Sequence, residues 1–298
     1  MSLDPDYERR KGFDSGFLGI DVPLPALSEA ARAKACTVRD VSGDAAYELK
    51  YHHFSVIMNK ETRLAFVAAV NFDASVEFRQ TREGADRWFF DPRIDQAFQA
   101  GKEFYSANPL DRGHLVRRAD AAWGRSAEEA AQANEDTFHF TNCSPQHEIF
   151  NQSAKAQSED LLLWGNIEQH IAKQIGASGG RLSIFNGPVF RTTDRVHRGL
   201  RVPKEFWKIV VYRKSTGNLT ALAFILSQEG LIADLPLEDF TVGPYRPFQI
   251  TIQKIEARTN LNFRNLRDAD PLEHGAFESL SAPGSASILL TSIEQIVT

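Results

Sequence analysis

Runs of apolar residues predict two β-hairpins in this chain. His53–Met58 and Leu64–Val70 are rich in β-branched and aromatic residues, and the turn-forming stretch Asn59–Thr62 separates them. Phe206–Tyr212 and Leu219–Leu226 follow the same pattern around a stretch that contains Ser, Gly and Asn. We therefore expect four strands joined in two antiparallel pairs.

Two further short runs, Phe138–Asn142 and Leu182–Asn186, predict single strands. The segment Ile288–Ile296 is apolar without a clear period, so its element type stays open. Together with the hairpins, these runs indicate antiparallel β-structure.

Helical spacing of apolar residues is found in fewer places. Ser126–Asp136 opens with a capping residue and carries Glu129 three positions later, which is a capping-box pattern. Leu161–Ile175 and Thr251–Asn260 place apolar residues at helical spacing. A short helix is expected near Arg93–Ala100, inside a charged and aromatic stretch that otherwise favours loops.

The chain of 298 residues contains no internal repeat, low-complexity block or Gly/Ser linker. We therefore predict one α+β domain over residues 26–298, with helices flanking the strands. Residues 1–25 are polar and end with Pro23 and Pro25, so they are expected to form an N-terminal arm that wraps the domain.

Composition excludes several protein classes. The chain is 42% hydrophobic and 24% charged, which is close to the average of folded proteins and excludes disorder and coiled coils. Because no run of about 18 apolar residues is present, no membrane helix is predicted. The first residues contain no apolar signal core, so a secreted or periplasmic location would require that a leader had been removed. Location otherwise stays open.

Charge is distributed unevenly along the chain. The net charge is −5, yet Arg181–Lys214 contains nine basic and two acidic residues and is therefore +7. Such a segment is typical either of a phosphate-binding face or of a solvated surface, and composition alone favours the latter.

One short segment gathers groups that suit acid–base chemistry. It runs from Asp111 through Arg112 and Gly113 to His114 and continues to Arg117 and Arg118. Histidine titrates near neutral pH and is the usual general base, while arginine suits an anionic substrate. A structural histidine is the alternative at this stage.

Asparagines 142 and 151, each close to a glutamine, form a second candidate group. An asparagine carbonyl can bind a hard cation such as Mg²⁺, which keeps most of its waters and needs only one or two protein oxygens. Turn formation is the alternative, since Asn and Pro favour turns.

Together these segments resemble the DNA/RNA non-specific endonucleases, the family of mitochondrial endonuclease G and the Serratia-type nucleases. The matching pieces are in the family's order and span roughly residues 50 to 265. They are Asp111-Arg-Gly-His114, Thr141-Asn-Cys-Ser-Pro-Gln146, Asn151-Gln152, Trp164-Gly-Asn-Ile-Glu168, Gly187-Pro-Val-Phe190, Val202-Pro-Lys-Glu-Phe-Trp-Lys208 and Ile255-Glu-Ala-Arg-Thr-Asn-Leu-Asn-Phe263.

The resemblance implies a ββα-metal (His-Me finger) nuclease fold with antiparallel sheets and flanking helices. It implies that His114 is the general base that activates water and that Asn151 is a direct Mg²⁺ ligand, with Mn²⁺ as an open substitute. Asp111 and Asn142 would support these two groups. One metal and one histidine suffice for this chemistry, so no second carboxylate cluster is needed.

The resemblance assigns the arginines less uniquely. Arg112, Arg117 and Arg118 are candidates for phosphate contacts. A catalytic arginine usually precedes an Asp-Pro pair such as Asp91-Pro92, which indicates Arg87, with Arg82 as the alternative.

The metal-shell glutamate is also ambiguous. Much of the family carries it eight residues after the metal asparagine, which here is Glu159, but the Trp-x-x-Ile-Glu pattern ends at Glu168. We prefer Glu168, because Trp164 and Ile167 also give that helix its apolar face.

The implied function is Mg²⁺-dependent endonucleolytic hydrolysis of DNA and RNA, leaving 5′-phosphate and 3′-hydroxyl ends. A catalytically weakened nucleic-acid-binding protein on the same fold is the first alternative. A thiol hydrolase that uses Cys143 and His147 is the second, although no basic environment for a thiolate is evident. A homodimer and an inhibitor protein stay open as partners, and no membrane partner is expected.

Overall fold

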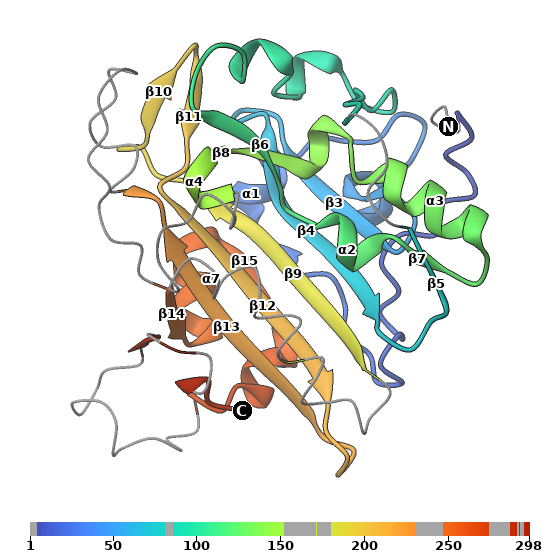
Figure 1. Ribbon diagram of the computed structural model, residues 1–298. Coiled ribbons are helices and arrows are strands. Elements are labelled where there is room, and N and C mark those ends of the chain that lie inside the picture. Colours follow the sequence, from blue (N-terminus) through green and yellow to red (C-terminus); the bar gives the residue numbers. More distant parts are fainter. Residues whose placement is uncertain are drawn as a thin grey trace.

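The computed structural model describes residues 5–80, 86–151, 171, 180–229, 247–273, 287–290, 292 and 295–298. Its main feature is an eight-stranded antiparallel sheet with the order β16-β14-β13-β12-β9-β4-β3-β2 (Figure 1). In chain order, the strands of this sheet are β2 Leu49–Lys50, β3 Phe54–Asn59, β4 Leu64–Asp73, β9 Arg181–Val189, β12 Glu205–Arg213, β13 Leu219–Ser227, β14 Pro247–Ile250 and β16 Ser287–Leu289.

The central strands are buried on both faces of the sheet. Because successive side chains of a strand point to opposite faces, one strand contributes to two cores. Phe206 and Val210 of β12 belong to the first hydrophobic cluster, whereas Trp207 and Ile209 belong to the second. This explains why these strands read as nearly continuous apolar runs.

Different elements cover the two cores. Leu115, Val116 and Ala121 pack into the first, so the region that contains the candidate histidine lies on that face. Ile252 and Ile255 of helix α7 (Ile252–Thr259) pack into the second. The sheet is therefore the middle layer, with the candidate site on one side of it.

Smaller elements surround the main sheet. Four two-stranded sheets pair β1 Ala26–Leu27 with β15 Leu261–Asn262, β5 Phe78–Arg79 with β7 Trp123–Gly124, β6 Leu110–His114 with β8 Cys143–His147, and β10 Arg195–His197 with β11 Leu200–Val202. The remaining described helices are α1 Glu29–Lys34, α2 Arg118–Ala121, α3 Ala127–Asp136 and α4 Glu148–Asn151. Short 3₁₀ helices span Asp44–Tyr47, Gln96–Phe98, Lys102–Phe104, Phe140–Asn142 and Arg264–Ala269.

Most elements predicted from periodicity are confirmed. Both hairpins form, as β3–β4 and β12–β13, and the strand expected at Leu182–Asn186 lies inside β9. Helix α3 begins after Ser126, whose hydroxyl accepts the backbone N–H of Glu129 at 3.2 Å. Helix α7 is confirmed as well, with Thr251 as its cap.

One expectation was wrong. Phe138–Asn142 is not a strand: its end is a 3₁₀ turn, and the strand begins only at Cys143. The buried Asn142 side chain bonds to backbone groups at this turn.

The short helix expected near Arg93–Ala100 is confirmed as the 3₁₀ helix Gln96–Phe98. It is followed by Gln99, whose side chain bonds to the backbone of Asp91.

Some predictions fall outside the described residues. This applies to the helix expected at Leu161–Ile175, of which only Ile171 is described; it is helical and buried in the first core. At the C-terminal end, a short strand, β16, pairs with β14. In the part of the chain that the structure describes, no helix is long and apolar enough to cross a membrane.

The N-terminal arm packs closely against the sheet. Phe13 and Val22 join the second core, and the backbone N–H of Phe13 donates to Ser55 Oγ at 2.8 Å. Gly12 adopts a φ of +80°, and a side chain there would clash with Ser55 Oγ at 2.6 Å. The division into an arm of residues 1–25 and a domain of residues 26–298 stays a prediction.

Candidate active site

Strands β6 and β8 pair antiparallel, and helix α4 follows β8 directly (Figure 1). The register places His114 opposite Cys143, and the backbone N–H of Glu148 donates to the carbonyl of Pro109 at 2.9 Å. The start of α4 is therefore held against the chain that enters β6. Two strands and a helix form one compact unit from segments that are distant in sequence.

This unit brings Asp111 and Asn151 together. The two residues are 40 positions apart, and Asn151 Nδ2 donates to Asp111 Oδ2 at 3.0 Å. Asn151 is exposed and Asp111 is half-buried, so solvent reaches this pair. Two oxygen-bearing side chains predicted to act together thus lie side by side at the surface.

Gly113 is required by the packing of β6 against β8. A Cβ atom at this position would lie 2.1 Å from Oε1 of Gln146. The Gln146 side chain therefore occupies the space that any larger residue would need. This contact explains why a glycine stands between Arg112 and His114.

His114 is the last residue of β6 and lies between aromatic rings. Its imidazole centroid is 4.8 Å from that of Trp88 and 5.1 Å from that of Phe138, which it meets edge to face. The guanidinium of Arg112 lies over the same Trp88 ring at 5.4 Å. Arg112 and His114 are two residues apart on one strand and share a face, so Trp88 orients both.

Asn142 is fully buried and holds the chain immediately after His114. Its Oδ1 accepts the backbone N–H of Val116 at 2.9 Å, and its Nδ2 donates to the carbonyls of Val116 and Thr137, each at 3.0 Å. The backbone N–H of Leu115 also donates to the Asn142 carbonyl at 2.9 Å. This geometry suits a residue that positions His114 rather than one that touches substrate.

The remaining predicted arginines differ in their surroundings. Arg117 forms a two-bond ion pair with Asp120, at 2.9 and 2.7 Å. Arg118 Nη1 donates to Asn134 Oδ1 at 3.2 Å. Arg87 is exposed. Arg112 thus differs from these arginines, because it contacts the Trp88 ring that His114 also contacts.

Three of the predicted positions, Glu168, its alternative Glu159 and the alternative arginine Arg82, lie outside the described residues. Their roles stay predictions.

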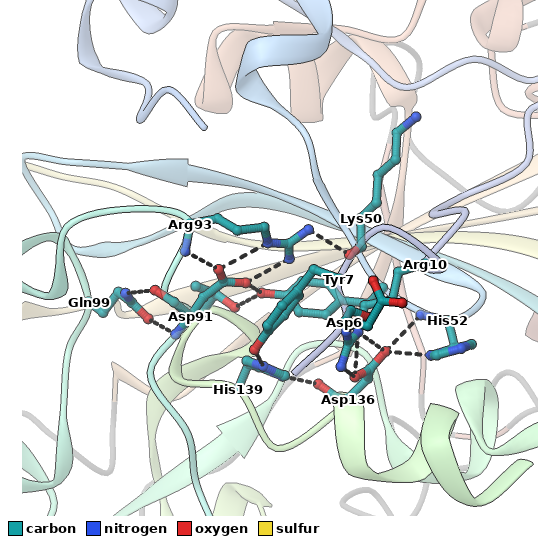
Figure 2. A network of polar contacts seen from close by, with 12 residues as sticks. Asp6, Tyr7, Arg10, Lys50, His52, Asp91, Arg93, Gln99, Asp136 and His139 are labelled. Carbon is teal, nitrogen blue, oxygen red and sulfur yellow. Dashed lines mark hydrogen bonds and ion pairs between the residues drawn. The ribbon is translucent and has the colours of Figure 1, made fainter. Parts of the chain in front are cut away.

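A buried ionic cluster lies at Asp136, the last residue of helix α3. Figure 2 shows Arg10 and His52 both directed at the carboxylate of Asp136. Arg10 Nη2 is 2.8 Å from Asp136 Oδ1, and His52 Nδ1 is 2.8 Å from Oδ2. Burial alone would raise the pKa of Asp136, but hydrogen bonds from His52 and Arg10 outweigh it and lower the pKa to about 2.

The same cluster continues to the 3₁₀ turn that contains Asn142. Tyr7 lies against His139, with the hydroxyl 2.7 Å from Nε2 (Figure 2). Burial lowers the pKa of His139. Tyr51 bonds to Thr141 Oγ1 at 2.7 Å and to Asp91, which pairs with Arg93. The N-terminal arm is thereby tied to the segment that supports His114.

The structure gives no support to Cys143 as a nucleophile. Its thiol is fully buried, and burial raises its pKa to about 12. The sulfur lies 3.5 Å from the hydroxyl of Tyr105 and 3.5 Å from the carbonyl of Phe140. A neutral, enclosed thiol of this kind is a packing residue.

Comparison with known proteins identifies the family. The family model described as DNA/RNA non-specific endonuclease matches residues 33–270. This chain belongs to that family.

The relatives that match are covered to different extents. The chain is 37% identical over 270 residues to the uncharacterized protein y4fB of Sinorhizobium fredii, covering 86% of this chain and 39% of that protein. It is 27% identical over 177 residues to a nuclease of Nostoc sp., covering 57% and 58%, and 23% identical over 252 residues to nuclease C1 of Cunninghamella echinulata, covering 79% and 87%. The chain thus spans less than two thirds of each of the first two relatives.

The fold of this chain is also found in a solved structure. The crystal structure of the EndoG/EndoGI complex matches 74% of this chain and 86% of that chain, with a TM-score of 0.54 and 15% identity. The expected α+β, ββα-metal nuclease fold is therefore confirmed.

Members of this endonuclease family typically bind a divalent metal, and the residues of the site fit such a cation. The Asp111 carboxylate and the Asn151 side-chain amide, which donates to it through Nδ2, lie side by side at the surface, and each carries an oxygen of the kind that a hard cation prefers. In the described part of the chain, no group of three or more His, Cys, Asp or Glu residues could hold a metal by itself.

The basic segment Arg181–Lys214 is not a single charged face. Arg181 pairs with Asp73 at 3.0 Å, and Arg191 pairs with Glu205. Lys208 is buried in the sheet, and burial, together with the nearby Arg117 guanidinium, lowers its pKa. Part of the +7 charge is thus architectural.

Sequence reasoning missed Trp88 and Gln146 as parts of the site. Trp88 stands in a charged stretch without periodicity, and only its contacts with His114 and Arg112 show its importance. Gln146 was noted as part of a motif, but nothing in the sequence indicates that it lies over Gly113.

Proposed function

We propose that this chain is a divalent-metal-dependent nuclease that hydrolyses internal phosphodiester bonds of DNA and RNA without reading sequence. The observation that carries the proposal is the β6–β8–α4 unit. In this unit, strand β6 carries Asp111, Arg112 and His114. The carboxylate of Asp111 contacts Asn151 of helix α4. Family membership and this arrangement support the same chemistry.

His114 acts as the general base. Its imidazole takes a proton from a water molecule whose oxygen forms the new bond to phosphorus, while the bond between phosphorus and the 3′ oxygen breaks. The 3′ oxygen takes a proton from solvent, so the products carry 5′-phosphate and 3′-hydroxyl ends. A positioned imidazole of this kind accelerates a reaction by about 10²–10⁴-fold.

Asn151 would hold the cation, with Asp111 beside it and Glu168, or Glu159 in its place, acting through water. Mg²⁺ is the proposed metal, and Mn²⁺ is expected to substitute. When bound, such a cation stabilises negative charge on the phosphate and on the leaving oxygen. Asn142 keeps His114 in place through the backbone of Val116.

Arginines supply the remaining positive charge. Arg112 lies on the strand face of His114 and is the first candidate for the scissile phosphate, and Arg87 is a further catalytic candidate. Arg117 and Arg118 remain proposed phosphate contacts. Contacts to phosphates position nucleic acid without reading its sequence, which accounts for the proposed lack of specificity.

Partners other than nucleic acid stay predictions. The solved EndoG was crystallised with EndoGI in a study of its inhibition. A corresponding inhibitor of this chain, and a homodimer, are proposals that the described contacts leave untested.

The experiment compares degradation of plasmid DNA and total RNA in Mg²⁺, in Mn²⁺ and in EDTA. Wild type is expected to degrade both substrates with either metal and neither in EDTA. His114→Ala should lower kcat by about 10²–10⁴-fold, because the general base is lost. Asn151→Ala should raise the metal concentration needed for half-maximal activity.

A matched control for Asn151→Ala is Asn218→Ala, because Asn218 is also exposed but lies in the turn between β12 and β13 at the far end of the sheet (Figure 1). It should retain full activity. A wild-type protein that binds DNA yet leaves it intact in both metals would instead be a weakened nucleic-acid-binding protein. Loss of activity on thiol alkylation would favour the thiol enzyme, which the burial of Cys143 opposes.

A further inference from the structure

Strands β10 and β11 form a separate two-stranded ribbon that stands next to β6 at one end of the molecule (Figure 1). The register pairs Val196 with Arg201 and His197 with Leu200. Directly paired residues share a face, so Val196 and Arg201 lie together on one side of the ribbon. Both side chains are exposed, whereas Leu200 is buried on the other side.

The ribbon is anchored to the loop that leads into the candidate site. Arg198 Nη1 donates to the carbonyl of Glu103 at 2.6 Å and to Ser106 Oγ at 3.2 Å. Asn108 Nδ2 lies 3.4 Å from His197 Nε2. Because β6 begins at Leu110, the ribbon is fixed to the residues that immediately precede Asp111.

Charge on the ribbon differs from charge on its flanks. On the flanks, Arg191 pairs with Glu205, and Lys204 pairs with Glu229 at 2.8 Å. On the ribbon, Arg201 Nη1 donates to the backbone carbonyls of Thr192 and Asp194, which are uncharged acceptors. Arg198 likewise donates to uncharged acceptors, the carbonyl of Glu103 and the hydroxyl of Ser106. The acceptors of Arg198 and Arg201 are therefore uncharged, so both arginines add positive charge to the ribbon.

Val196 adds an apolar element to this charged face. It is 54% exposed, more than any other large apolar side chain counted as exposed among the described residues. An exposed apolar residue beside an arginine is typical of a surface that contacts both the sugars and the phosphates of a nucleic acid. A two-stranded ribbon is also narrow enough to enter the major groove of B-form DNA.

We propose that the β10–β11 ribbon is a second substrate-binding surface, at which Arg201 and Arg198 contact phosphates beside the scissile one and Val196 lies against the adjoining sugar. The occupant is a strand of the nucleic acid held in the active site, so the inference rests on the proposed function. The contacts are to backbone groups and carry no sequence preference. They strengthen binding of substrate at a distance from the reacting phosphorus.

The test measures binding of a short fluorescein-labelled DNA duplex in EDTA, where no cleavage is expected, as salt rises from about 50 to about 200 mM. Arg201→Gln should raise Kd about threefold and reduce the slope of log affinity against log salt by about 0.9, the value for one lost phosphate contact. Val196→Asp should raise Kd and Val196→Lys should lower it, each by about threefold because one charge is added. Val196 is exposed, so these two variants are expected to fold.

Lys214→Gln is the matched control, because Lys214 is an exposed cation of the same basic segment but lies at the β12–β13 turn, at the opposite end of the sheet (Figure 1). It should bind as wild type does. Wild-type Kd and salt slope in the Arg201 and Val196 variants would overturn the ribbon proposal while leaving the nuclease intact. A wild type that binds no DNA at low salt would also overturn the ribbon proposal, and the cleavage assay in Mg²⁺ would then decide the proposed function separately. Shifted binding in a protein that cleaves nothing would instead support the ribbon and refute the proposed function.

Discussion

The buried cluster around Asp136 and the candidate site beside it use charged groups in opposite ways. In the cluster, the side chains of Arg10 and Asp136 are each 1% exposed and are paired with each other. In the site, Asp111 is half-buried, and Asn151 is exposed to solvent.

The difference follows from what each region must do. A buried charge is tolerated only when it is paired and hydrogen-bonded, so every cluster member is fixed by its partners. A general base and a metal ligand must reach water and substrate, so their surroundings have to stay accessible. The cluster therefore supplies rigidity, and the site supplies reactivity.

The two regions meet in the segment from Asp136 to Asn142. Its start is held by Arg10, its middle by Tyr7 through His139, and its end holds the backbone beyond His114. Variants of this segment can separate the contribution of rigidity from that of chemistry.

The largest expected effect on stability is that of Arg10→Ala. The change leaves the Asp136 carboxylate buried without its main cation, which should cost about 3–5 kcal/mol of unfolding free energy. Urea unfolding at neutral pH measures it. Arg9→Ala is the matched control, because the neighbouring Arg9 side chain is 78% exposed and pairs with Asp6 at the surface. Arg9→Ala should lower the unfolding free energy by at most about 1 kcal/mol. Equal losses in Arg10→Ala and Arg9→Ala would contradict the comparison.

Asn142→Ala should affect both regions and is expected to cost about 2–3 kcal/mol, because backbone groups of Val116 and Thr137 lose buried hydrogen bonds. Since Asn142 positions His114, kcat should fall as well. The metal concentration for half-maximal activity should stay at the wild-type value, unlike that of Asn151→Ala. A shifted metal requirement would show that Asn142 contributes to the metal site itself.

A further effect, of up to about 3 kcal/mol, is expected from acid. Burial lowers the pKa of His53 from about 6.5 in the unfolded chain to about 4 in the folded protein. The stability that this group contributes is therefore fully present above about pH 6.5. Stability should then fall as pH decreases from about 6.5 towards 4. Asp136, with its pKa lowered to about 2, acts in a lower window: its contribution is lost only as pH falls from about 4 towards 2.

Urea midpoints across the upper window would test this dependence. His53→Asn should flatten it, because asparagine accepts the φ of +67° at this position and does not titrate there. A dependence as steep as that of wild type would assign the acid sensitivity to other groups.

Local sequence patterns predicted the two large hairpins, helix α3 and helix α7, because each depends on periodicity within one segment. They failed at Phe138–Asn142, where a buried asparagine side chain replaces strand pairing with a tight turn. They also gave no sign that Trp88, in a stretch without periodicity, would contact His114 and Arg112.

The sequence by itself determined the family, since the Asp111–His114 motif, Asn151 and their ordered neighbours identify it, while the roles of these residues stay proposals. Only the tertiary structure decided which groups meet. It places Asn151 next to Asp111, buries Lys208 between neighbouring strands and joins the β10–β11 ribbon to the loop before β6. The physical reason is that such contacts join residues far apart in the chain, and they depend on how the layers pack as a whole rather than on any local pattern.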